Sequence, residues 1–175
     1  MPRRAAQAPS ASSAPAKKRA PSTSFVLERF LPYRLSVLAQ AVSEGLHERY
    51  ADPHGLSVAQ WRVMAQLARH APLSAQGLCA KTVMDKVTIS RAVNALAARR
   101  LVERAIDAED KRRSELRLTR AGAAMHAKIA PLALAFEAEL VAALSPAERK
   151  ALDALLEKLV ARALLLAPLQ TVVKP

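Results

Sequence analysis

The stretch Asp85–Thr119, "DKVTISRAVNALAARRLVERAIDAEDKRRSELRLT", decides the fold because its apolar spacing changes from helical to alternating. Asp85 is a residue type that caps the N-termini of helices. The apolar residues that follow it at helical spacing are Ile89, Val93 and Leu96. Two short segments, 101–106 and 115–119, then enclose the polar loop "DAEDKRRS". The stretch therefore predicts one helix followed by a β-hairpin.

The tip of this predicted hairpin carries three adjacent bases, Lys111, Arg112 and Arg113. Like charges repel one another across a hairpin, so an ordinary surface turn gains nothing from this arrangement. A duplex phosphate backbone supplies a physical reason to hold three cations together. The charged tip therefore indicates a contact with nucleic acid.

Two shorter helices are predicted upstream of the stretch. Ser57 and Gln60 have the spacing of a capping box and open a helix that contains Trp61. After the turn "HAPL", Ser74 is placed to cap a second helix that runs through Ala80. Three helices followed by a hairpin have the order of a winged helix-turn-helix. The predicted fold class is therefore mainly α with a small β-hairpin, extended by N- and C-terminal dimerisation helices.

The N-terminal extension should be one long helix. Apolar residues recur at three- and four-residue steps from Phe25 to Leu46. Pro32 lies inside this run and should either kink the helix or mark where its regular part begins. The segment "ADPHG" (51–55) should break the helix.

The C-terminal extension should hold a long helix after Thr119, kinked by Pro131, and a last helix capped by "SPAE" (145–148). Both terminal helices carry apolar stripes that the short helices are too small to cover. The residues expected in a dimer interface are Phe25, Leu27, Leu31, Leu152, Leu155, Leu156 and Leu159. A second subunit is favoured as the cover, with intramolecular packing of the two terminal helices as the alternative.

The charge balance favours a polyanionic partner. The chain has 27 lysines and arginines against 15 acids, a formal net charge of +12 over 175 residues. Nucleic acid or an anionic membrane surface would use this charge, and a basic protein without such a partner is the alternative. The first 23 residues hold five bases, no acid and much proline, alanine and serine. They predict a disordered arm, which is either a passive tail or a segment that follows DNA phosphates.

An enzyme is not favoured. The four glycines are too scattered for a phosphate-binding loop, and G-x-S-x-G and H-E-x-x-H do not occur. The four histidines have no paired metal-ligand spacing, so neither a metal nor a cofactor is expected. Cys79 is the single cysteine, which suits a reducing cytoplasm, and its thiol is expected to be a buried packing group. Without a long apolar run for a membrane helix, a cytoplasmic protein is expected.

At this point the sequence resembles the multiple antibiotic resistance regulator (MarR) family over about residues 25–165. The resemblance is carried by "LSVAQWRVMAQL" (56–67) and "MDKVTISRAVNALAARRLVERAIDAEDKRRSELRLTRAG" (84–122). Its most specific part is the hairpin, where the family pattern is D-P-x-D-R-R followed by L-T-x-x-G. Ala108 stands at the proline of that pattern. Lys111 stands at the first arginine and keeps the charge without the guanidinium fork.

The resemblance implies a homodimeric, sequence-specific DNA-binding repressor that a small aromatic acid or phenol releases from a near-palindromic operator. The segments "FLPYRLSVLAQAVS" and "QWRVM" are most similar to the branch that controls aromatic-acid breakdown. A nonspecific architectural DNA-binding protein without a ligand response is the alternative. The expected division is an arm (1–23), an N-terminal helix for dimerisation and the pocket (24–56), a winged helix-turn-helix (57–119) and C-terminal dimerisation helices (120–175).

The resemblance places helix 85–99 in the major groove of DNA. The residues expected to contact DNA from it are Lys86, Val87, Thr88, Ser90, Arg91 and Asn94. Arg91 either reads guanine or clamps a phosphate, whereas Lys86, Ser90 and Asn94 are expected to position the helix on phosphates. Ser74 and Gln76 in the preceding helix are further candidates, with plain capping by Ser74 as the alternative. In the wing, Lys111, Arg112 and Arg113 are expected to contact DNA, with Arg112 in the minor groove.

A ligand pocket is expected between the first helix and the helix triplet. An aromatic acid requires a flat apolar wall and a cation. The residues that supply these types are Tyr33, Arg34, Ser43, His47, Trp61 and Arg62. For Trp61, a plain role in the core is favoured over a role in the pocket.

Overall fold

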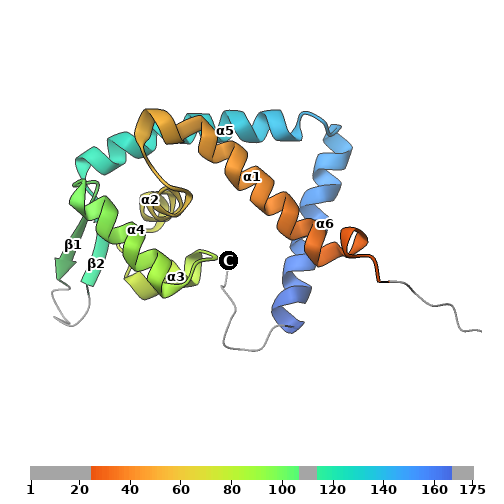
Figure 1. Cartoon of the computed structure of the whole chain (residues 1–175), viewed down its shortest axis with the longest axis horizontal. Helices are drawn as coiled ribbons and strands as arrows, with labels where there is room; N and C mark the ends of the chain where they lie inside the picture. The colour runs from red at the N-terminus through yellow and green to blue at the C-terminus, as the bar shows by residue number, and fades with distance from the viewer. Residues whose placement is uncertain (1–24, 107–113, 167–175) are drawn as a thin grey trace, which may run out of the picture. The chain divides into compact units, whose positions relative to one another are not determined.

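The computed structural model describes residues 25–106 and 114–166. In chain order these residues form η1 (Leu27–Arg29, a 3-10 turn), α1 (Leu31–His54), α2 (Val58–His70), α3 (Ala75–Lys81), α4 (Lys86–Ala98), β1 (Val102–Ile106), β2 (Ser114–Leu118), α5 (Arg120–Val141) and α6 (Pro146–Leu166). They divide into two compact units between Val37 and Leu38. The predicted class, mainly α with one small hairpin, is confirmed (Figure 1).

The first helix begins later than its apolar pattern predicts. Leu27 lies in the 3-10 turn η1, and α1 starts at Leu31. Pro32 is therefore the second residue of α1. The backbone N–H groups of a first helical turn have no partner inside the helix, so a proline costs no hydrogen bond there. Of the two predictions for Pro32, the start of the regular helix is confirmed.

The prediction that "ADPHG" breaks the first helix is wrong for all but its last residue. Helix α1 continues through Pro53 to His54, and the break falls at Gly55, whose φ is +60°. The N–H of Gly55 still donates to the carbonyl four residues earlier, at 2.6 Å. Arg99 donates to the carbonyls of His54 and Gly55, at 2.8 and 2.7 Å, and so satisfies the end of α1.

The predicted helix caps are present in the structure. Ser57 and Gln60 form a reciprocal capping box at the start of α2, with N···O distances of 3.2 and 2.9 Å. Ser145 and Glu148 do the same for α6, at 3.3 and 2.9 Å. Helix α5 is capped by the hydroxyl of Thr119 and runs as one helix past Pro131 to Val141. Local sequence therefore sets where these helices begin.

The two strands pair antiparallel, with Val102 opposite Leu118. A single residue extends this sheet, because Leu73 and Leu116 exchange backbone hydrogen bonds of 3.2 and 2.8 Å. The side chain of Leu116 is buried and fixes the hairpin to the helices. The loop that joins the strands, 107–113, lies outside the described residues.

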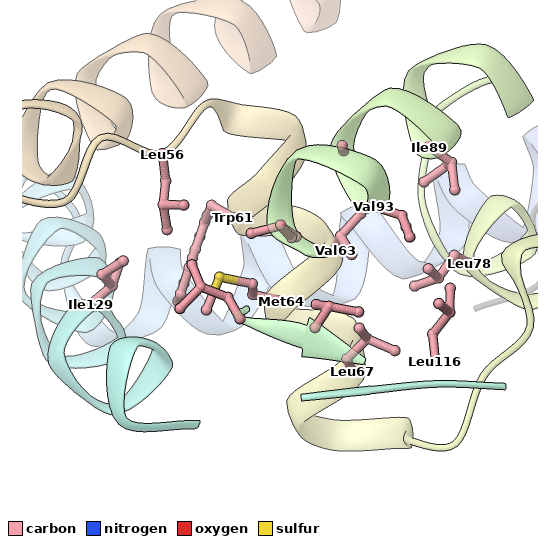
Figure 2. Packing of buried hydrophobic residues seen from close by; sticks show 14 of the residues in the cluster. Leu56, Trp61, Val63, Met64, Leu67, Leu78, Ile89, Val93, Leu116 and Ile129 are labelled. Carbon is pink, nitrogen blue, oxygen red and sulfur yellow. The ribbon is translucent and has the colours of Figure 1, made fainter. Parts of the chain in front are cut away.

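Helix α2 lies at the centre of the apolar core. Its residues Trp61, Val63, Met64 and Leu67 are buried, and Figure 2 shows them between Ile129 of α5 and the cluster formed by α3, α4 and β2. The α4 stripe predicted from spacing is confirmed, because Ile89, Val93 and Leu96 are at most 1% exposed. The core role of Trp61 is also confirmed. Cys79 is half-buried and packs against this core.

The terminal stripes are exposed rather than buried. The predicted interface residues Phe25, Leu27, Leu31, Leu152, Leu155, Leu156 and Leu159 all count among the exposed large hydrophobic residues. Among the helices in 25–106 and 114–166, none combines the length and apolar character needed to cross a membrane.

Candidate nucleic-acid interface and adjoining cavity

The start of α4 is fixed by Asp85. One carboxylate oxygen of Asp85 accepts the N–H groups of Val87 and Thr88, at 2.8 and 2.9 Å. The other oxygen accepts the hydroxyl of Thr88 at 2.6 Å. Hydrogen bonds from the Thr88 side chain and backbone hold the pKa of Asp85 below its ordinary value. The cap is therefore ionised at neutral pH and holds the first turn of α4 in place.

The outer face of α4 carries most of the predicted DNA-contacting residues in exposed positions. The exposed ones are Lys86, Val87, Ser90, Arg91 and Asn94. Thr88 differs, because it is half-buried and its hydroxyl belongs to the cap. Val87 is notable because an apolar side chain is 58% exposed in the first turn of the helix. This face offers cations, hydroxyl and amide groups, and one branched apolar side chain to a partner.

Asn94 has a partner in the hairpin that the sequence did not reveal. The guanidinium Nη2 of Arg104, on β1, donates to Oδ1 of Asn94 at 2.7 Å. Both residues are exposed. Spacing along a helix or a strand does not identify a contact between two different elements. The bond ties the outer face of α4 to the base of the wing.

A shallow groove of about 330 Å³ lies between the start of α2 and the exposed face of α4. Its polar lining residues are Ser57, Gln60, Thr88 and Arg91. Arg91 is therefore next to the capping box of α2 as well as on the outer face of α4. A phosphate or a base edge in this groove would therefore lie beside a guanidinium group.

The preceding helix and the wing complete the predicted interface. Ser74 and Gln76 are exposed. The hydroxyl of Ser74 accepts the N–H of Gly77 at 3.0 Å, so its capping role is confirmed. Lys111, Arg112 and Arg113 lie outside the described residues, and their contacts with DNA stay predictions.

A second cavity, of about 450 Å³, is lined in part by residues that lead into α4. Its lining residues are Ala39, Trp61, Arg62, Ala65, Gln66, Lys81, Thr82 and Val83. Arg62 and Lys81 give it two cations, and Val83, 87% exposed, gives it an apolar edge. Arg62 donates to the hydroxyl of Ser43 at 2.9 Å, which fixes one end of its guanidinium group. This combination can hold a small anion with an apolar body.

Some predicted pocket residues meet and others do not. Trp61 and Arg62 line this cavity. Ser43 does not line it, but its hydroxyl accepts a hydrogen bond from Arg62. His47 instead places Nε2 3.1 Å from the carbonyl oxygen of Leu56. Tyr33 and Arg34 belong to the shorter unit, 25–37, and their role as pocket residues stays a prediction.

The sequence reasoning missed six of the eight lining residues: Ala39, Ala65, Gln66, Lys81, Thr82 and Val83. Gln66 is one helical turn beyond Arg62 on α2, which is a signal that helical spacing could have supplied. Lys81 is the last residue of α3, and Thr82 and Val83 follow it directly. No local pattern indicates that this segment closes against α2.

Three rings, those of Trp61, His126 and Tyr50, lie together. Trp61 is 5.4 Å from His126 in stacked geometry and 5.9 Å from Tyr50. Burial raises the pKa of Tyr50 to about 12, although the charge on Arg62 acts to lower it. Burial also lowers the pKa of His126. These three rings are therefore uncharged at neutral pH and join α1, α2 and α5.

The sequence and the fold of this chain are similar to those of known transcription regulators. The MarR family model matches residues 54–113. The HTH-type transcriptional repressor NicR of Pseudomonas putida is 32% identical over 113 residues, which cover 65% of this chain and 71% of the repressor. A MarR family regulator from Silicibacter pomeroyi superposes with a TM-score of 0.67 at 31% identity, over 78% of this chain and 92% of that one.

A third relative is BpsR of Bordetella bronchiseptica, whose DNA binding is regulated by 6-hydroxynicotinic acid. It superposes with a TM-score of 0.70 at 25% identity, over 77% of this chain and 96% of that one. Together with the capped α4, the hairpin and the exposed polar face between them, these similarities identify the chain. It belongs to the MarR family of winged-helix, DNA-binding transcription regulators.

Proposed function

We propose that this chain is a homodimeric, sequence-specific repressor that a small aromatic carboxylic acid releases from its operator. The observation that carries the proposal is the position of the 450 Å³ cavity. Its lining includes Thr82 and Val83, and Asp85, the cap of α4, follows two residues later. A ligand that fills the cavity therefore acts directly on the segment that positions the helix proposed to read DNA.

An aromatic acid suits this cavity for three reasons. Arg62 and Lys81 can share one carboxylate, and Arg62 is already oriented by Ser43. Trp61 and Val83 offer apolar surface to a ring. The volume lies in the range of small-molecule sites. The regulation of BpsR by 6-hydroxynicotinic acid supports this ligand class.

The homodimer is proposed from the exposed terminal stripes. Leu155, Leu156 and Leu159 on α6 are 41–56% exposed, and Phe25 in the shorter unit is 70% exposed. Apolar surface of this extent on a soluble protein is usually covered by a partner. A second copy also explains why a near-palindromic operator fits, since a two-fold protein binds a two-fold site.

The effector part of the proposal is tested by thermal unfolding with 6-hydroxynicotinic acid or benzoate. A ligand present at 100 times its dissociation constant should stabilise the protein by about 2.7 kcal/mol. Arg62→Gln should weaken this response at least about tenfold, because the ligand loses a charged partner. Arg69→Gln is the matched control, since Arg69 is on the same helix but exposed and outside the lining. Equal stabilisation of the two variants by the ligand would contradict the proposal that the ligand binds in this cavity.

A further inference from the structure

Two side-chain acceptors at this face, the Asp85 carboxylate and the amide oxygen of Asn94, already accept hydrogen bonds within the protein. Both carboxylate oxygens of Asp85 accept hydrogen bonds from the first turn, at 2.6–2.9 Å. The amide oxygen of Asn94 accepts from Arg104 at 2.7 Å. A base edge that approaches α4 therefore finds these acceptors in use.

Arg104 also decides which way the Asn94 amide faces. A guanidinium group has only donors, so it can pair only with the oxygen of the amide. The amide NH2 group of Asn94 is then turned away from Arg104. Asn94 thus offers donors outward, while its acceptor faces the wing.

The remaining groups on this face are donors and methyl groups. Lys86 and Arg91 are exposed and can only donate. In the described part of the chain, neither forms an ion pair. Val87 exposes its methyl groups. Ser90 can donate or accept, and it is the exception.

The four bases differ in what they offer to such a face. Guanine O6 and thymine O4 are acceptors in the major groove, whereas adenine N6 and cytosine N4 are donors. Thymine adds a methyl group that apolar side chains contact. Purine N7 accepts in both adenine and guanine, so the exocyclic group makes the distinction.

We propose that α4 selects keto bases, guanine and thymine, on the strand that it faces, and that Arg104 enforces this choice by holding the amide of Asn94. Arg104 is thus a positioning residue for specificity. The inference rests on the proposed function, because it takes α4 as the helix that enters the major groove.

The test is a binding selection from randomised duplexes with the full-length protein. The wild type should select guanine or thymine at the positions contacted by α4. In Arg104→Ala the Asn94 amide can turn and bind adenine with both its groups. Adenine should then rise about fivefold or more at one position per half-site, consistent with the size of bidentate base contacts. Arg104→Gln should show the same gain, because glutamine can pair with the amide in either orientation.

Two controls separate specificity from charge. Arg117→Ala removes the same charge from the neighbouring strand, where Arg117 pairs with Glu115 at 2.9 Å, and it should leave base preference unchanged. The double variant Asn94→Ala/Arg104→Ala should not gain adenine, because the amide is absent. If the double variant selected adenine more often than the wild type, the proposal would be overturned.

The outcomes distinguish this inference from the proposed function. Failure to select any common site would contradict the proposed function itself. If all variants select a common site, and the base preferences of the Arg104 variants equal those of Arg117→Ala, only the role of Arg104 is overturned. Adenine or cytosine under α4 in the wild-type selection would overturn the keto preference.

Discussion

Gly122 shows how one residue limits the geometry of the whole DNA-binding unit. A Cβ atom built at Gly122 would lie 1.9 Å from the carbonyl oxygen of Leu101, which belongs to the backbone that enters the hairpin. The first turn of α5 and the start of the wing therefore approach as closely as backbone allows. This is the physical reason for glycine in the L-T-x-x-G segment.

Gly122→Ala should lower the free energy of unfolding by about 3 kcal/mol, the upper end of what overpacking costs, because two backbone segments must separate. Gly77→Ala is the control. At Gly77 the nearest atom is a side-chain atom at 3.4 Å, and alanine in a helix should add about 0.5–1 kcal/mol. Denaturant unfolding measures both values. Similar stabilities for the two variants would contradict the contact at Leu101.

Tyr50 should make the protein sensitive to alkali. Its pKa is about 12 in the folded chain against 10.0 for an ordinary tyrosine, so the unfolded chain ionises first. Stability is therefore complete below pH 10 and falls as the pH rises from 10 towards 12. Tyr50→Phe should lose less stability than the wild type over this range.

Tyr33→Phe is the matched control for this measurement, because Tyr33 is 40% exposed and the chemical change is the same. Its loss of stability with pH should match that of the wild type. If Tyr50→Phe also follows the wild-type curve in denaturant unfolding at several pH values, Tyr50 is not buried as described.

At the scale of elements, α4 and the wing should read DNA differently. Arg91→Ala should cost about 1–3 kcal/mol on the true site and relax preference at one position per half-site, because Arg91 lies on the exposed face of α4. Arg112→Ala should weaken binding to every sequence and reduce the salt dependence by about one unit per subunit. Selections over randomised sites at two salt concentrations measure both effects. If only Arg112→Ala changed the base preference in the major groove, the roles assigned to α4 and the wing would be wrong.

The starts of the helices that carry a side-chain cap could be predicted from sequence much better than the contacts of those helices. The caps at Ser57, Asp85 and Ser145 are local patterns of three or four residues, and all three are present. The end of α1 was misplaced because a proline in the last turn removes only one N–H, and Arg99 satisfies the open carbonyls from far along the chain. The sequence around the end of α1 contains no pattern that indicates a hydrogen-bond donor so far along the chain.

In the candidate site, too, the features with a local sequence pattern were predicted and the contacts between distant residues were not. The exposed face of α4 was predicted because helical spacing separates Ile89 and Val93 from Lys86 and Arg91. The hydrogen bond between Asn94 and Arg104 joins a helix to a strand. The residue spacing within either element therefore could not predict it. The cavity was predicted in part, because no local pattern indicates that Lys81, at the end of α3, lines the same cavity as Trp61 and Arg62 of α2.

At the scale of the whole molecule, the exposed leucines of α6 should hold a dimer together. Leu155→Glu should reduce the mass measured by light scattering at micromolar concentration towards that of one chain, because a charge would be buried without a partner. Val87→Glu is the control, since Val87 is equally exposed but lies on α4. It should remain a dimer and lose DNA binding. A stable, folded monomer of the wild type would refute the dimer.

The central claim is that the chain binds a defined operator and leaves it when the effector binds. Footprinting with the full-length protein on fragments of its own genome tests this most directly. The account predicts one short, near-palindromic protected site whose half-sites are about 10 base pairs apart, with protection lost when the aromatic acid is added. Uniform coating of every fragment, unchanged by any such acid, would contradict the account and indicate an architectural DNA-binding protein instead.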